Sequence, residues 1–272
     1  MRKEGKFTVH NSIDTLPSAV LRPQAYLDMA GNWNSSRFLS VVNPVTNKEY
    51  TSVTNRYVIK QHSDAINEVE KAIAANPEYG DYKRCIKTYS EDGKMVARYD
   101  FINSPVTIDA GDKICPSITV RNDYACSWVF TVIFGAFRVI CSNGLVIGDV
   151  GMRFKRKHTF ICQEFNSDML EKGMHTFSEQ KGIWQGWLND LWSREKVDDT
   201  LKKMDIVPDK TGYNKVTKLK ETGTGITIDG SLVIGGAVSK WIFFNILSQY
   251  ITHHVKSISR KVMLEDKIRR LF

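Results

Sequence analysis

The sequence predicts an α+β fold, with an antiparallel, hairpin-rich sheet flanked by helices in a single main domain. Three observations predict it. One amphipathic helical pattern comes first, several strand pairs joined by turn residues follow, and helical patterns fill most of the rest. The chain has 272 residues, 42% of them hydrophobic and 11% aromatic, so it can bury a core and is not a disordered chain.

The pattern divides the chain into an N-terminal arm at 1–50, a main domain at 51–252 and a basic amphipathic C-terminal helix at 253–272. Prolines and a polar cluster interrupt the first part, so it predicts no long element. The interruptions are Pro17, Pro23, Pro44 and Asn32–Ser36. We expect this part to form either an arm or a strap laid across the main domain.

The main domain begins with a short amphipathic helix at 65–75, where Ile66, Val69 and Ile73 recur at helical spacing. Asn76-Pro77 ends this pattern. Three strand pairs follow, each around turn residues. They are 84–89 with 94–101 around Glu91-Asp92-Gly93, 117–121 with 127–133 around Asn122-Asp123, and 137–141 with 145–147 around Ser142-Asn143-Gly144. A basic stretch at 153–158 comes next.

Helical patterns dominate after Phe165 and continue to Met204. The sequence then predicts a polar, basic loop at 210–224, a strand-like segment at 225–234 and a strongly apolar helix at 239–250. The C-terminal helix has an apolar side of Val255, Ile258, Val262, Ile268 and Leu271. That helix can dock on the domain, pair with another subunit, or lie on nucleic acid or an anionic membrane. Of these arrangements we favour docking of the helix on the domain, with its basic side exposed to solvent.

The net charge favours a polyanionic partner, because 38 Lys and Arg stand against 30 Asp and Glu, a balance of +8. Arg153–Lys157 contributes four positive charges, and the segment from Lys256 to Arg270 contributes a net four. Together they equal the whole excess. Charge is therefore concentrated in two candidate contact regions rather than spread along the chain.

One motif carries a resemblance to a known family. From Phe137 to Gly148 the chain reads F-R-x-x-C-x-N-G-L-x-x-G, and a basic stretch ending in His158 follows. This pattern resembles the phage/plasmid-like "domain of unknown function 932" family. The segment from Asn55 to Val69 and the segment from Thr227 to the helix at Trp241 are similar to its opening and closing parts. The resemblance covers about 50 to 255, with the basic tail outside it. It implies an origin on a phage, prophage or plasmid, and no settled activity.

The candidate nucleic-acid-binding residues are Arg138, Asn143, Arg153, Lys155, Arg156 and Lys157. If 153–158 is a strand, residues 153, 155 and 157 share one face and could follow a phosphate backbone. The alternative is a solvated edge strand, since edge lysines and arginines discourage aggregation. Asn143-Gly144 is first of all a structural turn between two strands, and a structural ion pair is the more common role for an arginine such as Arg138. Aromatic residues near the strands could stack on bases. They are Tyr82, Tyr89, Tyr99, Tyr124 and Trp128.

The sequence contains few of the motifs that indicate an enzyme. Gly223 and Gly225 are not followed by the Lys-Ser/Thr of a phosphate-binding loop, and Asp198, Asp199 and Asp229 lack the spacing of a magnesium site. The five cysteines form no C-x-x-C pair. We therefore expect no catalytic residues, no cofactor and no metal, and cysteines that stay reduced in a cytoplasmic chain of a bacterial host. The sequence shows neither a signal peptide nor an apolar run long enough for a membrane span.

These observations favour a non-enzymatic, phage-type protein that binds or anneals single-stranded DNA in recombination or replication. Two alternatives remain. One is an interaction module that binds a host or phage protein, and the other is a metal-dependent nuclease that uses Asp229. Whether the chain forms a homo-oligomer is left open.

Overall fold

The computed structural model describes residues 7–109, 112–138, 143–145, 153–159, 164–206, 225–226, 232–233 and 237–272. An eight-stranded antiparallel sheet forms its centre, with β1, β5, β6, β8, β9 and β10 as successive neighbours. In addition, β11 pairs with β9, and β7 pairs with β8. The strands are β1 (Phe7–His10), β5 (Lys83–Tyr89), β6 (Lys94–Asp100), β7 (Val106–Asp109), β8 (Asp112–Asp123), β9 (Phe130–Arg138), β10 (Asn143–Leu145) and β11 (Arg153–Arg156). The predicted α+β class is confirmed.

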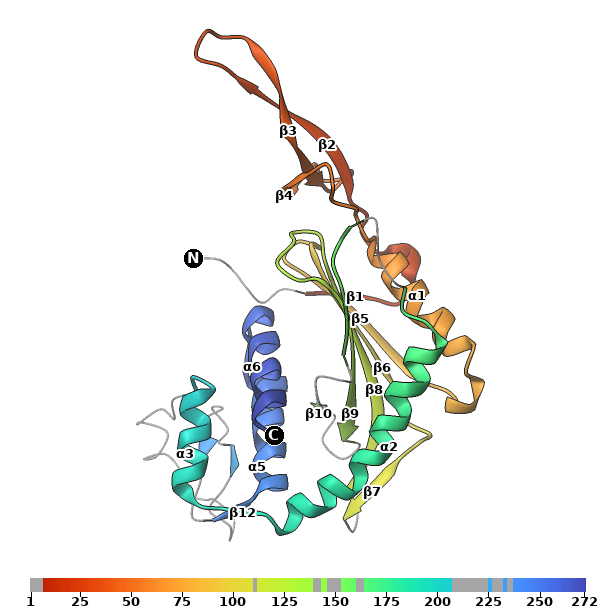
Figure 1. The fold of residues 1–272 in the computed structure, drawn as a ribbon, viewed down its shortest axis with the longest axis vertical. Coiled ribbons are helices and arrows are strands. Elements are labelled where there is room, and N and C mark those ends of the chain that lie inside the picture. Colours follow the sequence, from red (N-terminus) through yellow and green to blue (C-terminus); the bar gives the residue numbers. More distant parts are fainter. Residues whose placement is uncertain are drawn as a thin grey trace.

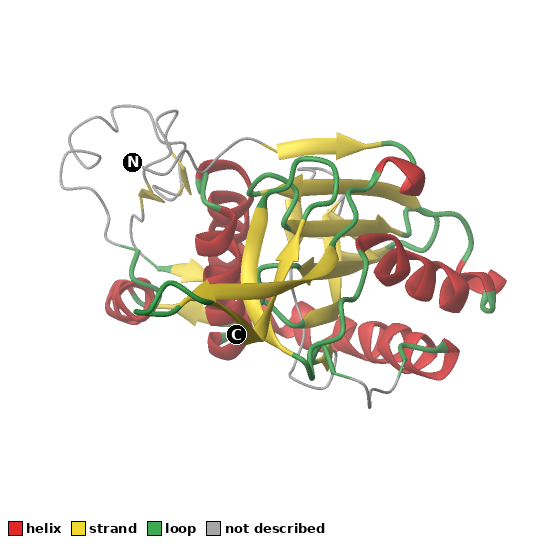
Figure 2. Cartoon of the chain, turned by 90° about the horizontal axis from the view of Figure 1, so that it is seen from above, coloured by secondary structure: helices red, strands yellow, loops and turns green. Residues whose placement is uncertain are grey.

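Helices α1 (His62–Ala74) and α2 (Ser167–Asn189) lie along one face of this sheet (Figure 1). Their apolar stripes, including Ile66 and Leu170, pack against alternate strand residues such as Ile118 and Val120 of β8, all fully buried. The helix predicted at 65–75 is therefore confirmed. The residues at helical spacing, Ile66, Val69 and Ile73, are the ones that α1 buries. Figure 2, seen from above, shows helices on both sides of the sheet.

Further α-helices of the described residues are α3 (Arg194–Lys203), α5 (Lys240–Gln249) and α6 (Ile258–Leu271), with a π-helical turn at Tyr250–His254 between the last two. Side-chain oxygens of Ser193, Ser239 and Ser257 accept a backbone N–H at the start of these helices, which explains where each begins. The described residues also contain two short strand pairs. They are β12 (Leu191–Trp192) with β15 (Val238–Ser239), and β13 (Gly225–Ile226) with β14 (Leu232–Val233).

The N-terminal part contains longer strands than its sequence predicts. Strands β2 (Val20–Leu27), β3 (Trp33–Val42) and β4 (Glu49–Thr54) form a separate three-stranded sheet, whose β2–β3 hairpin projects from the domain (Figure 1). The prediction of no long element was wrong, because Pro23 lies in an edge strand beside a register shift, where proline is tolerated. The Asp28 carboxylate accepts the N–H groups of Ala30 and Asn32 and so holds the hairpin tip.

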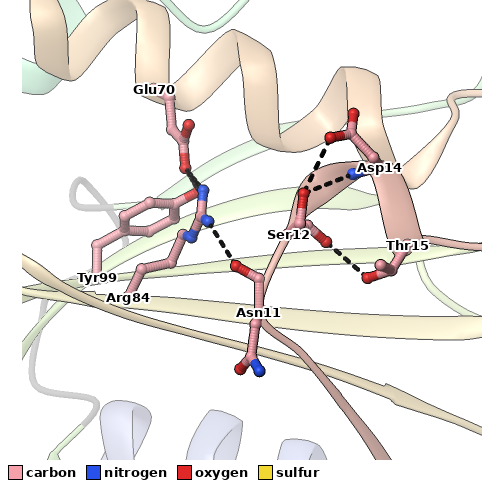
Figure 3. A network of polar contacts seen from close by, with 7 residues as sticks. All are labelled: Asn11, Ser12, Asp14, Thr15, Glu70, Arg84 and Tyr99. Atoms are coloured by element: carbon pink, nitrogen blue, oxygen red, sulfur yellow. Dashed lines mark hydrogen bonds and ion pairs between the residues drawn. The ribbon is translucent and has the colours of Figure 1, made fainter.

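A polar network fastens the segment after β1 to the main domain (Figure 3). Arg84 of β5 donates to Glu70 of α1 at 2.5 Å and to the backbone oxygen of Asn11 at 3.3 Å. The Tyr99 hydroxyl donates to the same Glu70 carboxylate at 3.1 Å. Ser12 opens the 3-10 turn η1 (Ile13–Thr15) by accepting the N–H of Asp14.

Two of the predicted strand pairs are confirmed, as β5 with β6 and β8 with β9. The turn predicted at Asn122-Asp123 was wrong, because both residues lie in β8 and pair with Met95 and Lys94. The turn predicted at Asn143-Gly144 was wrong. Asn143 pairs with Arg138 and Gly144 pairs with Phe137, so both residues belong to strand β10. Positions 139–142 lie outside the described residues, as does the predicted loop at 210–224.

Candidate nucleic-acid interface

The strand register brings cations from distant segments onto the sheet face that α1 and α2 leave uncovered. Lys87 pairs with Val96, which pairs with Arg121, and Thr131 lies between Arg121 and Lys155. Directly paired residues point to the same side of a sheet. The row from Lys87 to Lys155 therefore crosses four strand spacings of about 4.8 Å, or roughly 19 Å.

A second row runs two residues away on the same face, from Arg98 through Thr119 and Ile133 to Arg153. Lys94 lies on this side as well, because its Nζ donates to Ser259 of α6 at 3.3 Å. We call this set of cations the basic face. It consists of Lys87, Lys94, Arg98, Arg121, Arg153 and Lys155.

Helix α6 lies over part of the basic face. Arg121 donates from Nη2 to Glu265, and Arg153 donates from Nη1 to Asp266 at 3.1 Å. These are the two acidic residues of α6, and both are used on the sheet. Leu264 and Ile268 of the same helix are buried in the core. The helix docks on the sheet through these two ion pairs, and its Lys267 forms a third ion pair with Asp205, which follows α3.

A cleft of about 190 Å³ opens between α6 and strands β5, β6 and β8. Four cations line it, namely Lys87, Arg98, Arg121 and Lys261, together with the ring of Tyr89 and the carboxylate of Glu265. We call it the basic cleft. The Arg121 side chain is only 3% exposed, and within the described part of the chain its Nε and Nη1 have no hydrogen-bond partner.

The electrostatics of the cleft reflect burial and crowding of like charges. Burial lowers the pKa of Lys261, Glu265 opposes this shift, and the positive charge of Lys87 adds to it. Burial also raises the pKa of Glu265, against the opposing pull of Arg121 and Lys261. Burial raises the pKa of Tyr89 to about 12, so its hydroxyl stays neutral. The cleft is net positive with a neutral aromatic wall.

The structure separates the cations predicted within 153–158. Arg153 and Lys155 lie on the α6 side of β11, while Arg156 lies on the opposite side. There it donates to Glu68 of α1 at 3.0 Å, with its guanidinium 4.9 Å from the centre of the Phe130 ring. Arg153 and Arg156 are about one-tenth exposed, whereas Lys155 and Lys157 are exposed. The predicted alternation is confirmed over Arg153–Arg156, where β11 ends, and both arginines hold elements together.

Arg138 and Asn143 face each other across β9 and β10, but their side chains lie outside the description. Of the aromatic residues considered for base stacking, Tyr99 and Tyr124 are fully buried. Trp128 lies under Lys94, whose Nζ is 4.7 Å from the ring centre, and Tyr89 lines the basic cleft. Two of these aromatic rings therefore lie beside the basic face.

The acidic residues considered for a magnesium site are not brought together in the described part of the chain. Among the described residues, no group of three His, Cys, Asp or Glu could hold a metal ion, and Asp229 lies outside them. Asp198 and Asp199 form exposed ion pairs with Arg194 and Lys202. Over the same described segments, no helix combines the length and apolar character that crossing a membrane requires.

A family comparison decides what the chain is related to. The profile of the domain of unknown function DUF932 matches residues 49–271, which is most of the chain. The chain belongs to the DUF932 family. The match corrects the predicted limit near residue 255, because it includes α6, while β2 and β3 lie before its start. No curated protein and no solved structure matches the chain.

Sequence reasoning did not find the basic cleft. Lys87, Arg98 and Arg121 each occupy a polar position in an alternating strand, which is a visible signal. Alternation tells which residues share a face within one strand, but only the register between strands places these three side chains around one space.

Proposed function

We propose that this DUF932 protein binds single-stranded nucleic acid on the basic face, with the basic cleft as the main contact. The observation that carries the proposal is the strand register, which assembles Lys87, Arg98, Arg121 and Lys155 on one side of the sheet from segments far apart in the chain. Grooves that combine lysine and arginine with aromatic rings hold single strands without reading their sequence.

Different cations serve different purposes in this proposal. Lys87, Lys261 and Lys155 contact phosphates, and Tyr89 offers a ring at the wall of the cleft. Arg153 and Arg156 keep their ion pairs with Asp266 and Glu68, so they position α6 and α1 against the sheet. The contacts predicted for Arg138, Asn143 and Lys157 stay predictions, as does an origin on a phage or plasmid.

The test is fluorescence anisotropy of a labelled oligothymidylate at low and at moderate salt. We expect affinity to fall steeply with salt. The double variant Lys87→Ala with Lys155→Ala removes two phosphate contacts, so the slope of log affinity against log salt becomes shallower by about 1.4. Affinity at low salt falls at least severalfold. The matched control, Lys172→Ala with Lys181→Ala, removes the same charge from exposed positions of α2 and leaves binding nearly unchanged.

Absence of binding at low salt would refute the proposal. So would an equal loss of affinity in the two double variants, because that result would assign binding to net charge alone. A duplex of the same length serves as the comparison ligand, and we expect it to bind more weakly than the single strand.

A second candidate function, binding of a protein partner, is favoured by the β2–β3 hairpin. Its tip presents four exposed apolar side chains, Tyr26, Leu27, Met29 and Trp33, and the hairpin lies before the family match. Contiguous apolar patches on a protein surface commonly mark sites of interaction with another molecule. A pull-down after nuclease treatment tests it: a stoichiometric partner that is lost in the Met29→Ser, Trp33→Ser variant supports this function, and a partner retained by that variant excludes the hairpin.

A further inference from the structure

Strand β1 carries two exposed apolar side chains on the basic face. Phe7 pairs with Tyr89 and Val9 pairs with Lys87, so both side chains point to the side of the sheet that holds the cations. Phe7 is 50% exposed and Val9 is 53% exposed. Single exposed apolar residues are common on protein surfaces, so the neighbours of Phe7 decide what its ring can do.

Two aromatic rings beside the basic face each lie under a lysine. The Lys87 Nζ is 4.5 Å from the centre of the Phe7 ring, and the Lys94 Nζ is 4.7 Å from the centre of the Trp128 ring. Both distances are within the range of a cation–π interaction. Each pair therefore presents an ammonium group and a partly exposed ring side by side.

The strand register connects the two pairs. Phe7 pairs with Tyr89, and Tyr89 pairs with Lys94, which contacts Trp128. The ring centres of Phe7 and Tyr89 are 5.9 Å apart. We call Phe7, Tyr89 and Trp128 the aromatic row. Lys87 lies two residues from Tyr89 along β5, or about 7 Å, so cations and rings form neighbouring lines across the strands.

The combination of rings and ammonium groups selects the ligand. An apolar peptide would use the rings and leave the lysine charges unneutralised, whereas a simple polyanion would use the lysines and leave the rings in water. A nucleotide carries a flat base and a phosphate on two sides of one sugar, so it engages both. Stacking on an aromatic side chain accepts every base, because every base has a π-face.

We propose that Phe7 and Trp128 each stack an unpaired nucleobase, while Lys87 and Lys94 contact the phosphates next to those bases. This inference rests on the proposed function, and it adds that the bases contribute to binding as well as the phosphates. The half-buried ring of Tyr89 supports the Phe7 ring from the side. Bases inside a duplex are paired and stacked, so they reach such rings only at the cost of unstacking.

The experiment compares two labelled oligomers of equal length and equal phosphate number by fluorescence anisotropy at low salt. One is oligothymidylate, and the other is an abasic oligomer with the same sugar-phosphate backbone. We expect the full chain to bind oligothymidylate at least about tenfold more tightly, because the abasic oligomer has no base to stack on either ring.

Single variants assign this difference to the rings. Phe7→Ala and Trp128→Ala should each weaken binding of oligothymidylate about tenfold and leave binding of the abasic oligomer nearly unchanged. Phe7→Tyr and Trp128→Phe keep a ring, so they should retain most of the affinity. If an alanine variant does not fold, the comparison of the two oligomers on the parent chain still decides the question.

The chain offers a matched control for each ring. Val9 is exposed on the same strand and the same face as Phe7 but has no ring, and Trp33 is an exposed tryptophan of the β2–β3 hairpin. Val9→Ala and Trp33→Ala should leave the affinity for both oligomers unaltered. A loss in these controls as large as that in Phe7→Ala and Trp128→Ala would overturn the assignment.

The two oligomers also separate this inference from the proposed function. Equal affinity for both, or an equal loss for both in Phe7→Ala and Trp128→Ala, would overturn the stacking residues and leave the proposed function standing. Lys87→Ala, in contrast, should weaken binding of both oligomers alike, because both carry the phosphates. If neither oligomer binds at low salt, the proposed function is refuted and the stacking residues with it.

Discussion

The two faces of the eight-stranded sheet are built from the same strands but by different interactions. On one face, Ile118 and Val120 of β8 are fully buried against α1 and α2. On the other face, Thr119 and Arg121 of the same strand face α6. The first face is stabilised by apolar burial, and the second by ion pairs and two apolar residues of α6. The difference indicates that folding depends mainly on the first face, and it is the second face to which we assign the proposed binding of nucleic acid.

The largest expected effect tests that division directly. Ile118→Ala removes buried methyl groups from the apolar face and should lower the free energy of unfolding by about 2–5 kcal/mol. Thr119→Ala, one residue away on the basic face, should change it by less than about 0.5 kcal/mol. Urea denaturation of both variants measures the contrast. Equal losses would show that the two faces contribute alike.

Acid should destabilise the apolar side of the sheet through His62. This histidine is fully buried, and burial lowers its pKa to about 3. The Nε2–H of His62 donates to the backbone oxygen of Asp92 at 3.1 Å, and Nδ1 accepts from the side-chain amide of Asn122 at 2.9 Å. A proton added at Nδ1 would therefore face the N–H of Asn122 and break that hydrogen bond. Because the pKa of His62 is lower in the native state than in the unfolded state, the protein loses stability as the pH falls below the unfolded-state pKa, near 6.5.

The expected slope is about 1.4 kcal/mol per pH unit between pH 6.5 and the native pKa. Denaturation midpoints at pH 7.5 and 5.5 measure it for the parent chain and for His62→Gln, which has no group to protonate. If both chains lose the same stability on acidification, His62 is not the cause.

Glu265 should respond to pH in the opposite sense on the basic face. Burial raises its native pKa above its unfolded value, so the native state binds more protons and stability falls as pH rises through that interval. The effect should be smaller than that of His62, because Arg121 and Lys261 oppose the shift. Glu265→Gln removes this component. A variant whose pH profile above pH 4.5 matches that of the parent would contradict the assignment.

The β2–β3 hairpin belongs to neither face and gives the smallest expected effect. Met29 and Trp33 are exposed, so Met29→Ser with Trp33→Ser should change the free energy of unfolding by less than about 0.5 kcal/mol. Urea denaturation checks this. A loss above 2 kcal/mol would mean that the tip packs on the main domain.

Sequence patterns predicted the elements that are specified by residues close together in the chain. The helix at Ile66 and the hairpin closed at Asp92-Gly93 follow from apolar spacing and turn residues, and both are present. The β2–β3 hairpin was missed, because the polar residues of β3 and the prolines nearby favour loops. Pro23 is accommodated only because β2 is an edge strand with a register shift beside that residue. The basic cleft could not be predicted, since Lys87, Arg121 and Lys261 meet only through register and the docking of α6.

The ion pairs between α6 and the sheet have a consequence for synthesis. Ribosomes make the chain from its N-terminus, so Arg121 and Arg153 emerge well before Glu265 and Asp266. About 100 residues separate β11 from α6, an interval of roughly 5–20 s at the usual rate of translation. During that interval the nascent sheet carries these arginines without their carboxylate partners. The basic face then lacks the cover and the two carboxylates of α6 until that helix is made and docks.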